Sequence, residues 1–210
     1  MSLVLAADYR VPDFDHWWAR LTGDLPRLPS LGAHHIVVYR SLDDASRVFV
    51  TIGVRERGPV DALLRSPVMF SWFDSAGVEE IPPMFAGEVV EKIELAGDAA
   101  APAVPGAVIV AAIAPVGRLE GFEGLDRLRA SVHAAVARLA ASGVRRFWIY
   151  RALDDQAEVM ILLQIATERQ AEQWIRHPDA AAAFMAEAGA GAYPPLFVGR
   201  LVQAIEVPGD

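Results

Sequence analysis

The sequence predicts an α+β fold in which two tandem βαββαβ units pack their antiparallel sheets face to face, as a barrel within one chain. Two observations carry the prediction. The segment Gly32–Pro67 recurs as Gly143–Pro178 without a gap and with nine identities. The strand expected at residues 158–166, "EVMILLQIA", is apolar on both sides, so both of its faces must be buried.

The elements of the first unit are predicted from its apolar segments and from the Gly, Pro and Asp residues that separate them. "LVLAADY" at residues 3–9 and "HHIVVYR" at 34–40 are expected as strands, and "SLDDAS" between residues 41 and 46 is typical of a tight hairpin. Pro12 and the acids after it indicate the start of a helix. The expected elements are strand 3–9, helix 12–21, strand 34–40, strand 47–54, a helix over 59–77 interrupted at Ser66-Pro67, and strand 84–95.

The second unit repeats this order. "IYRALDD" corresponds to "VYRSLDD" of the first unit, and "PPLFVGRLVQAIEV" corresponds to "PPMFAGEVVEKIEL". The expected elements are strand 106–116, an uninterrupted helix 122–143, strand 144–150, strand 158–166, helix 168–189 and strand 196–207. The chain therefore reads as a tandem duplication, with a first unit at 1–95, an Ala/Pro linker at 96–106 and a second unit at 107–207.

Composition excludes several classes of protein. The 210 residues carry a net charge of −8, with 19 basic residues scattered among 27 acidic ones, which disfavours nucleic acid and anionic membrane surfaces as partners. There is no cysteine, hence no disulfide and no Cys-based metal site. No apolar run has the length of a membrane span, and the N-terminus lacks a basic leader. We expect a cytoplasmic protein.

Four short motifs carry a resemblance to a known family: "DFDHW" at 13–17, "VYRSLDD" at 38–44, "LLRSP" at 63–67, and "AGV" with the later "PP" at 76–83. With the βαββαβ order, which is the ferredoxin-like motif, they resemble the dimeric α/β-barrel superfamily, and within it proteins like the antibiotic biosynthesis monooxygenases. The resemblance implies a small-molecule pocket between the sheet and helices of a unit. It also implies that this fused chain closes its barrel without a partner, although further oligomerisation stays open.

One feature of the family is missing. In the superfamily, haem-degrading and some quinone-forming members rely on an Asn together with Trp or His, whereas this sequence contains no Asn. That part of the catalytic pattern is not carried over, and we expect neither a metal nor a cofactor. Either His133 or His177 would be the axial haem ligand if the chain bound haem as some tandem relatives do.

The first unit contains the candidate site. Gly23, Pro26 and Pro29 end its first helix early. The shortened helix either leaves a cleft over the sheet, roofed by an irregular loop, or reflects drift in a duplicated copy. Around it we expect His35 and His16 as proton-transfer residues, since a histidine titrates near neutral pH. The expected ligand-binding residues are Trp17, Trp18, Tyr39 and Trp72.

Each candidate has a structural alternative. One of the adjacent Trp17 and Trp18 must belong to the core, because neighbouring residues on a helix point about 100° apart. His34 and His35 are expected on opposite faces of their strand, so they are not expected to bind one metal together. His35 has Arg146 as its counterpart in the second unit, so the fold does not require it; the alternative is a partly solvated residue at a strand start.

The function predicted from the sequence is binding of an apolar aromatic compound. The activity would be that of a cofactor-independent monooxygenase or a cyclase. The alternatives are a non-catalytic ligand-binding or structural barrel and, below it, a haem-binding barrel.

Overall fold

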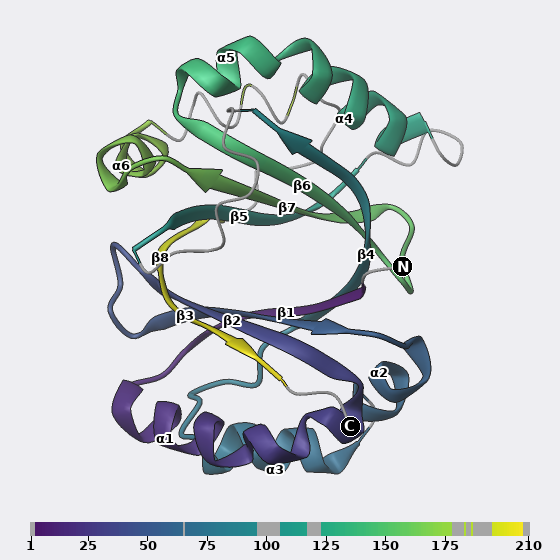
Figure 1. Ribbon diagram of the computed structural model, residues 1–210, viewed down its shortest axis with the longest axis vertical. Helices are drawn as coiled ribbons and strands as arrows, with labels where there is room; N and C mark the ends of the chain where they lie inside the picture. Colours follow the sequence, from purple (N-terminus) through teal and green to yellow (C-terminus); the bar gives the residue numbers. More distant parts are fainter. Residues whose placement is uncertain are drawn as a thin grey trace. The chain divides into compact units, whose positions relative to one another are not determined.

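A computed structural model describes residues 3–64, 66–95, 106–116, 123–177, 183, 186 and 195–207. The described residues form an α+β structure of antiparallel strands and helices (Figure 1). Hydrogen bonding links the strands in the order β1-β3-β2-β8-β5-β7-β6-β4. The predicted α+β class is therefore confirmed. Residues 96–105 of the expected linker lie outside the described part of the chain.

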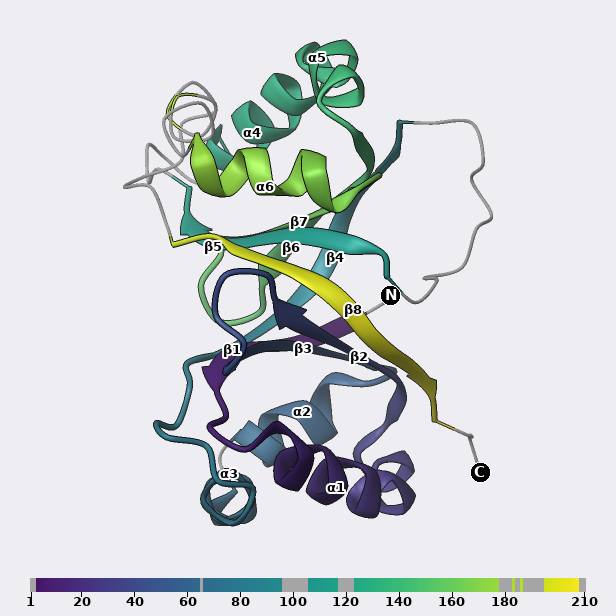
Figure 2. The same cartoon turned by 90° about the vertical axis from the view of Figure 1, so that its left-hand side faces the viewer.

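The chain divides into two compact units, Met1–Ala86 with Leu201–Asp210, and Gly87–Arg200. In the first unit, strand β1 pairs with β3 from Leu3↔Val54 to Arg10↔Arg47, and β2 pairs with the other edge of β3. All its helices cover one face of this sheet (Figure 2). The elements are β1 Leu3–Arg10, α1 Phe14–Asp24, the 3₁₀ turns η1 Leu25–Arg27 and η2 Pro29–Leu31, β2 Ala33–Ser41, β3 Arg47–Val54, α2 Arg57–Leu64, α3 Pro67–Ser75 and the start of β4 Met84–Glu94.

The core of the first unit lies between the sheet and these helices. Alternate strand residues such as Ile36, Val38 and Val48 are fully buried there, together with Trp17 from α1. Asp13 caps α1 by accepting a hydrogen bond from the His16 N–H at 2.9 Å. Pro12, expected within the first turn, lies one residue before this cap.

The second unit has the same order of elements. Strand β5 pairs with β7 from Val108↔Ile165 to Pro115↔Glu158, and β6 pairs with the other edge of β7. Helices α4, α5 and α6 cover one face of this sheet (Figure 2). The elements are β5 Val108–Pro115, α4 Glu123–Ala134, α5 Val136–Ala141, β6 Val144–Ala152, β7 Glu158–Ile165, α6 Glu168–Arg176 and β8 Phe197–Glu206.

The sequence predicted one uninterrupted helix at the start of this unit. In the structure this helix is divided at Ala135 into α4 and α5. Ala135 has φ −94° and ψ 0°, and its N–H is shared between the carbonyls of Ser131 and Val132. The hydrogen bond from the Leu139 N–H to the Ala135 carbonyl, 2.9 Å long, resumes the helical pattern at once. The division is therefore a local tightening rather than a change of direction by proline.

Two strands belong to both units. β4 begins in the first unit, but from Gly87↔Ala152 to Glu94↔Arg146 it pairs with β6 of the second unit. β8 pairs with β5 through Val108↔Arg200 and Ala111↔Phe197 and then continues beside β2, where the Val207 N–H donates to the His34 carbonyl at 2.9 Å. The compact units therefore differ from the sequence repeats by an exchange of strand ends.

Equivalent positions of the two halves share a detail that goes beyond element order. The β2–β3 pairing shifts register between Ala33 and His35, and the β6–β7 pairing shifts between Val144 and Arg146. Gly32 and Gly143, the first identical pair of the repeat, precede these bulges with φ of 73° and 92°, a conformation that glycine adopts without strain. No helix in the described part of the chain is long and apolar enough to cross a membrane.

Candidate functional site

A cavity of about 960 Å³ lies within the first unit, between its sheet and its helices. Its floor is the helix-facing side of β1 and β3 with the first residue of β4, and its walls come from α1, η1, η2, α2 and α3. The floor residues are Leu5, Ala7, Tyr9, Val50, Ile52 and Met84, and the apolar wall residues include Leu21, Leu28, Leu63, Met69 and Phe73. This size falls in the range of about 300–1,000 Å³ that small-molecule sites occupy.

The local sequence explains why the space is not filled. α1 ends at Asp24, and the chain continues in two 3₁₀ turns that contain Pro26 and Pro29, so no further helical turn covers β3. Opposite it, Pro67 separates α2 from α3, and Ser66 caps α3 by accepting from the Val68 N–H at 3.1 Å. The cavity therefore lies where the sequence placed a cleft beneath a shortened helix.

Tyr9 is the polar group on the cavity floor. Its ring is held edge-on against Trp17, 6.1 Å between centroids, and against Phe73, 5.5 Å between centroids. Burial raises the pKa of Tyr9 well above its ordinary value, and the nearby Trp17 indole N–H offsets part of this effect. That N–H does not reach hydrogen-bond geometry, so Trp17 Nε1 is a buried donor without a partner in the described structure. The Tyr9 phenol is therefore neutral at physiological pH.

A polar network crosses one side of the cavity rim, between α1 and α3. The Asp24 carboxylate accepts a 3.0 Å hydrogen bond from Trp72 Nε1. It also pairs with Arg20, at 3.4 Å, and with Arg27, at 3.1 Å. Arg20 Nε donates to Ser75 Oγ at 3.2 Å, so this network adds a second contact between α1 and α3. Asp24 is mostly shielded from solvent, whereas the Arg27 side chain is 79% exposed.

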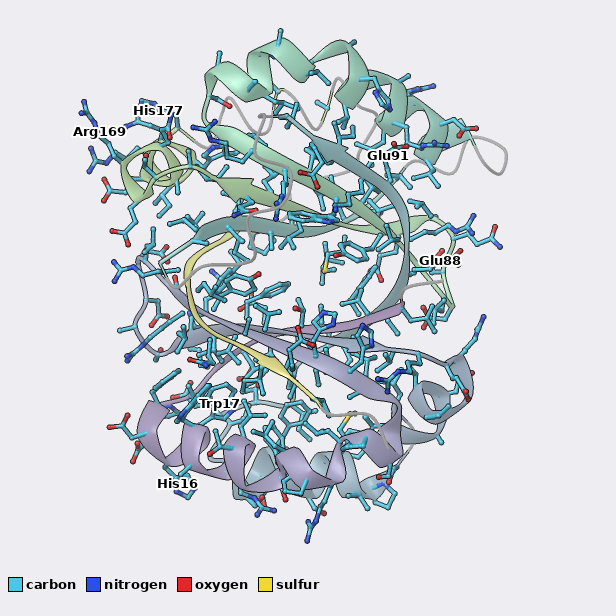
Figure 3. All side chains as sticks on the ribbon, viewed as in Figure 1. His16, Trp17, Glu88, Glu91, Arg169 and His177 are labelled. Carbon is cyan, nitrogen blue, oxygen red and sulfur yellow. The ribbon has the colours of Figure 1, made fainter. Side chains whose placement is uncertain are left out.

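Among the aromatic residues predicted to bind a ligand, Trp72 alone lines the cavity. Trp17 is fully buried in the core and Trp18 packs against that core (Figure 3). Trp18 stacks on Phe14 with an interplanar angle of 11°. The Arg40 guanidinium lies over the Phe14 ring, 4.6 Å from its centroid. Trp17 and Trp18 therefore lie in and against the core rather than among the residues that line the cavity.

The residues predicted for proton transfer lie away from the cavity. Figure 3 shows His16 on the outer side of α1, where its Nε2 lies 3.1 Å from the Ser75 carbonyl oxygen. His35 lies on β2 and is not among the residues that line the cavity. Tyr39 is buried and its ring lies 6.3 Å from that of Phe49. The structure thus brings none of these three to the cavity.

The prediction that His34 and His35 point to opposite faces is wrong, because the bulge in β2 breaks the alternation at this point. Their rings meet edge to face with centroids 4.4 Å apart. His34 Nδ1 is buried without a partner in the described structure. Burial lowers the pKa of His35, and the neighbouring His34 lowers it further, while Glu206 acts in the opposite direction. No group of three potential metal ligands occurs among the described residues.

Tyr9, Arg20 and Asp24 were not predicted from the sequence. A signal for Tyr9 exists, since Leu5, Ala7 and Tyr9 alternate along one strand and share its helix-facing side. Leu21 and Asp24 are three apart on α1 and therefore share a face. Their convergence with Trp72 depends on how α1 packs against α3, which one helix alone does not reveal.

Comparison with known proteins shows the fold. No protein-family model and no curated protein matches the sequence. Among solved structures, an anthrone oxidase-like protein aligns with a TM-score of 0.70 at 12% identity, over 98% of this chain and 93% of that one. An uncharacterised ferredoxin-fold protein from Listeria monocytogenes, related to antibiotic biosynthesis monooxygenases, aligns with a TM-score of 0.53 at 9% identity, over 97% and 95% of the chains.

A haem-binding protein from Thermus thermophilus aligns with a TM-score of 0.54 at 17% identity, over 97% of this chain and 93% of that one. At such identities the likeness establishes the fold and not the activity. The chain has the ferredoxin fold of proteins like the antibiotic biosynthesis monooxygenases, as the sequence motifs indicated.

Proposed function

We propose that the protein binds an apolar, aromatic small molecule in the cavity of its first unit. The observation that carries this proposal is the cavity itself, about 960 Å³ in volume and floored by aliphatic side chains. Aromatic side chains, Phe73 and Trp72, form part of the wall, and the phenol of Tyr9 offers a hydrogen-bonding group on the floor. Such a site buries most of an aromatic ligand and orients it with a few polar contacts.

Binding is tested with anthracene-2-carboxamide, a neutral tricyclic probe. Trp72 lines the cavity, so energy transfer from tryptophan to the anthracene ring reports occupancy. The variant Ile52→Trp places a larger side chain on the cavity floor and is expected to weaken binding at least tenfold. The matched control Ile205→Trp makes the same change on β8, outside the cavity, and should bind as the wild type does. Equal affinity in the two variants would place the ligand elsewhere.

A catalytic role of the monooxygenase or cyclase kind is the second candidate, supported by the similarity to an anthrone oxidase-like protein. In a cofactor-independent oxidation, the deprotonated substrate itself donates an electron to dioxygen, and anthrone plus dioxygen gives anthraquinone plus water. Of the groups that line the cavity, the Asp24 carboxylate accepts protons and the Tyr9 phenol stabilises a developing oxyanion. His35 and His16 remain proposals for proton transfer from outside the cavity.

Oxygen uptake with anthrone distinguishes these assignments. If Asp24 or Tyr9 acts directly, Asp24→Asn or Tyr9→Phe should reduce the rate at least tenfold, while His35→Ala and His16→Ala leave it nearly unchanged. The opposite pattern would favour the histidines. Binding of the anthracene probe without any oxygen uptake would favour the non-catalytic alternative.

Haem is a less favoured occupant. The Thermus thermophilus relative binds haem, but haem iron needs an axial side chain, and no histidine occurs among the described residues that line this cavity. His133 lies beside Glu91 of the second unit, with its Nε2 3.6 Å from the carboxylate. A Soret shift on adding haemin, abolished by His133→Ala or His177→Ala, would revive this alternative.

A further inference from the structure

The charges at the cavity rim narrow the class of ligand. We infer that the molecule bound in the cavity is a carboxylate, with its apolar body on the sheet and its anionic end beside Arg20 and Arg27. This inference rests on the proposed binding function and specifies its ligand.

The rim carries one more positive charge than negative charge. Arg20, Asp24 and Arg27 are the charged residues that line the cavity in the described structure. Asp24 lies between the two arginines, 3.4 Å from one and 3.1 Å from the other, so a single carboxylate is shared by two guanidinium groups. At neutral pH the three groups sum to a charge of +1. The whole chain carries −8, so this rim is a local exception to the charge of the protein.

Both arginines keep unused donors toward a ligand. A guanidinium has five N–H donors in a planar fork that matches a carboxylate. Arg20 uses Nε for Ser75 Oγ and Nη2 for Asp24, and Arg27 uses Nη1 for Asp24. Nη1 of Arg20 and Nη2 of Arg27 form no hydrogen bond or ion pair with another described residue. The shared Asp24 holds the two side chains at one side of the rim, which reduces the entropy lost on binding an anion.

The floor of the cavity is apolar, so the negative charge of the ligand is expected at the rim. The floor offers Leu5, Ala7, Val50 and Ile52, and burying a carboxylate against such surfaces without a cation is strongly unfavourable. Tyr9 is the polar group on that floor, and it is neutral. The ligand is therefore expected to lie with its rings on the floor and its carboxylate at the rim.

A series of rim charges tests the inference on the full chain. Asp24→Asn gives a rim charge of +2, the wild type +1, Arg27→Gln zero, and Arg20→Gln with Arg27→Gln −1. Asn at position 24 keeps the size of the side chain and an oxygen that accepts from Trp72 Nε1, and Gln keeps a shorter, uncharged polar side chain in place of each arginine. The control Arg10→Gln removes an arginine that is also paired with an aspartate, Asp44, but lies outside the cavity.

The probes are anthracene-2-carboxylate and its neutral isostere anthracene-2-carboxamide, and the quantity measured is the ratio of their dissociation constants. We expect the carboxylate to bind about tenfold more tightly in the wild type, and the preference to change by about threefold to tenfold per unit of rim charge. It should increase in Asp24→Asn, approach unity in Arg27→Gln and reverse in the double variant. Arg10→Gln should match the wild type. Added salt should reduce the preference, since these charges are partly exposed.

The carboxamide affinity of each variant is the internal reference, because the ratio of the two dissociation constants cancels any change that affects both probes alike. Near-UV circular dichroism shows whether each variant keeps its tertiary packing. Equal affinity of the two probes for the wild type, or one preference shared by every variant, would overturn the inference while leaving the binding function intact. If the wild type binds neither the carboxamide nor the carboxylate, the proposed function is contradicted, and this inference with it.

Discussion

At the scale of single residues, the His35 ring occupies the space into which a side chain at Gly53 would extend. A Cβ atom at Gly53 would overlap the His35 imidazole, which lies against the glycine on the neighbouring strand. Gly53→Ala should therefore destabilise the protein by about 1–3 kcal/mol, as overpacking does. The double variant Gly53→Ala/His35→Ala removes the overlap and should recover most of the loss. Urea unfolding of the four proteins measures the coupling; additive effects would mean that the ring moves aside freely.

The same histidine makes stability depend on pH. Burial and the adjacent His34 lower the pKa of His35 below the value of about 6.5 that it has in an unfolded chain. Below about pH 6.5 the unfolded state binds more protons than the folded state at this residue. The contribution of His35 to the free energy of unfolding is therefore complete above about pH 6.5 and decreases as the pH falls. His35→Gln should flatten the decline in urea midpoints between about pH 6.5 and 5. An unchanged slope would show that other groups cause it.

The residues that line the cavity show what the sequence reveals at this scale. Trp72 was predicted because it was expected beside the cleft that a shortened first helix would leave. Tyr9 was not, because an aromatic residue in a strand is common and its exposure to a cavity depends on what α1 and α3 leave uncovered. Arg20 and Asp24 read as an ordinary exposed pair four apart on a helix until the Trp72 N–H is placed beside them.

At the scale of secondary-structure elements, α1 determines the form of the cavity. It supplies Leu21 and Asp24 to the wall, and its early end leaves β3 uncovered. Its first turn depends on Asp13, whose carboxylate accepts from the His16 N–H. The helix is short, so each terminal contact is a substantial part of its stability.

Loss of this cap is expected to be measurable. Asp13→Ala leaves the His16 N–H without its side-chain partner and should lower the free energy of unfolding by about 0.5–2 kcal/mol. The matched control Asp15→Ala removes the same charge from the same turn, where no cap bond is formed, and should cost less. Urea unfolding compares the two variants. If both cost the same, the contribution of Asp13 is one of charge and not of its hydrogen bond.

The strands themselves follow the alternation of the sequence closely, and the exceptions have a physical cause. Leu3–Arg10 and Arg47–Val54 were predicted within a residue or so, because both are short apolar runs, the second rich in β-branched residues, and the Asp-containing hairpin separates β2 from β3. The bulge at His34 was not predicted, because one extra residue in a strand changes no turn signal and interrupts the alternation only at one point. Because of that single residue, the rings of His34 and His35 lie in contact instead of on opposite faces of the strand.

At the scale of the whole molecule, the repeats visible in the sequence are not the units that pack compactly. Each copy contains a complete set of strands, but β4 leaves the first unit after Ala86 and β8 leaves the second after Arg200. The sequence predicts which segments are strands from local alternation. It does not specify which edge a terminal strand joins, since the backbone hydrogen bonds of β4 would be satisfied equally well on another antiparallel edge.

This exchange of strand ends predicts cooperative unfolding. Loss of the first unit removes the residues that continue β4 and β8, which are edge partners of β6 and β5 in the second unit. The chain should therefore melt in one calorimetric transition. At 100 times its dissociation constant, anthracene-2-carboxylate should stabilise the folded state by about 2.7 kcal/mol. For a chain of this size that raises Tm by about 5–10 °C.

The ligand shift tests the coupling, because the cavity lies wholly within the first unit. If the two units unfold together, the whole transition moves upward with the ligand and its calorimetric enthalpy equals its van't Hoff enthalpy. Two transitions, of which the ligand moves one, would show that the shared strands do not couple the units. In that case the unit unaffected by the ligand should be the one that contains β5, β6 and β7, since it contributes no residue to the cavity.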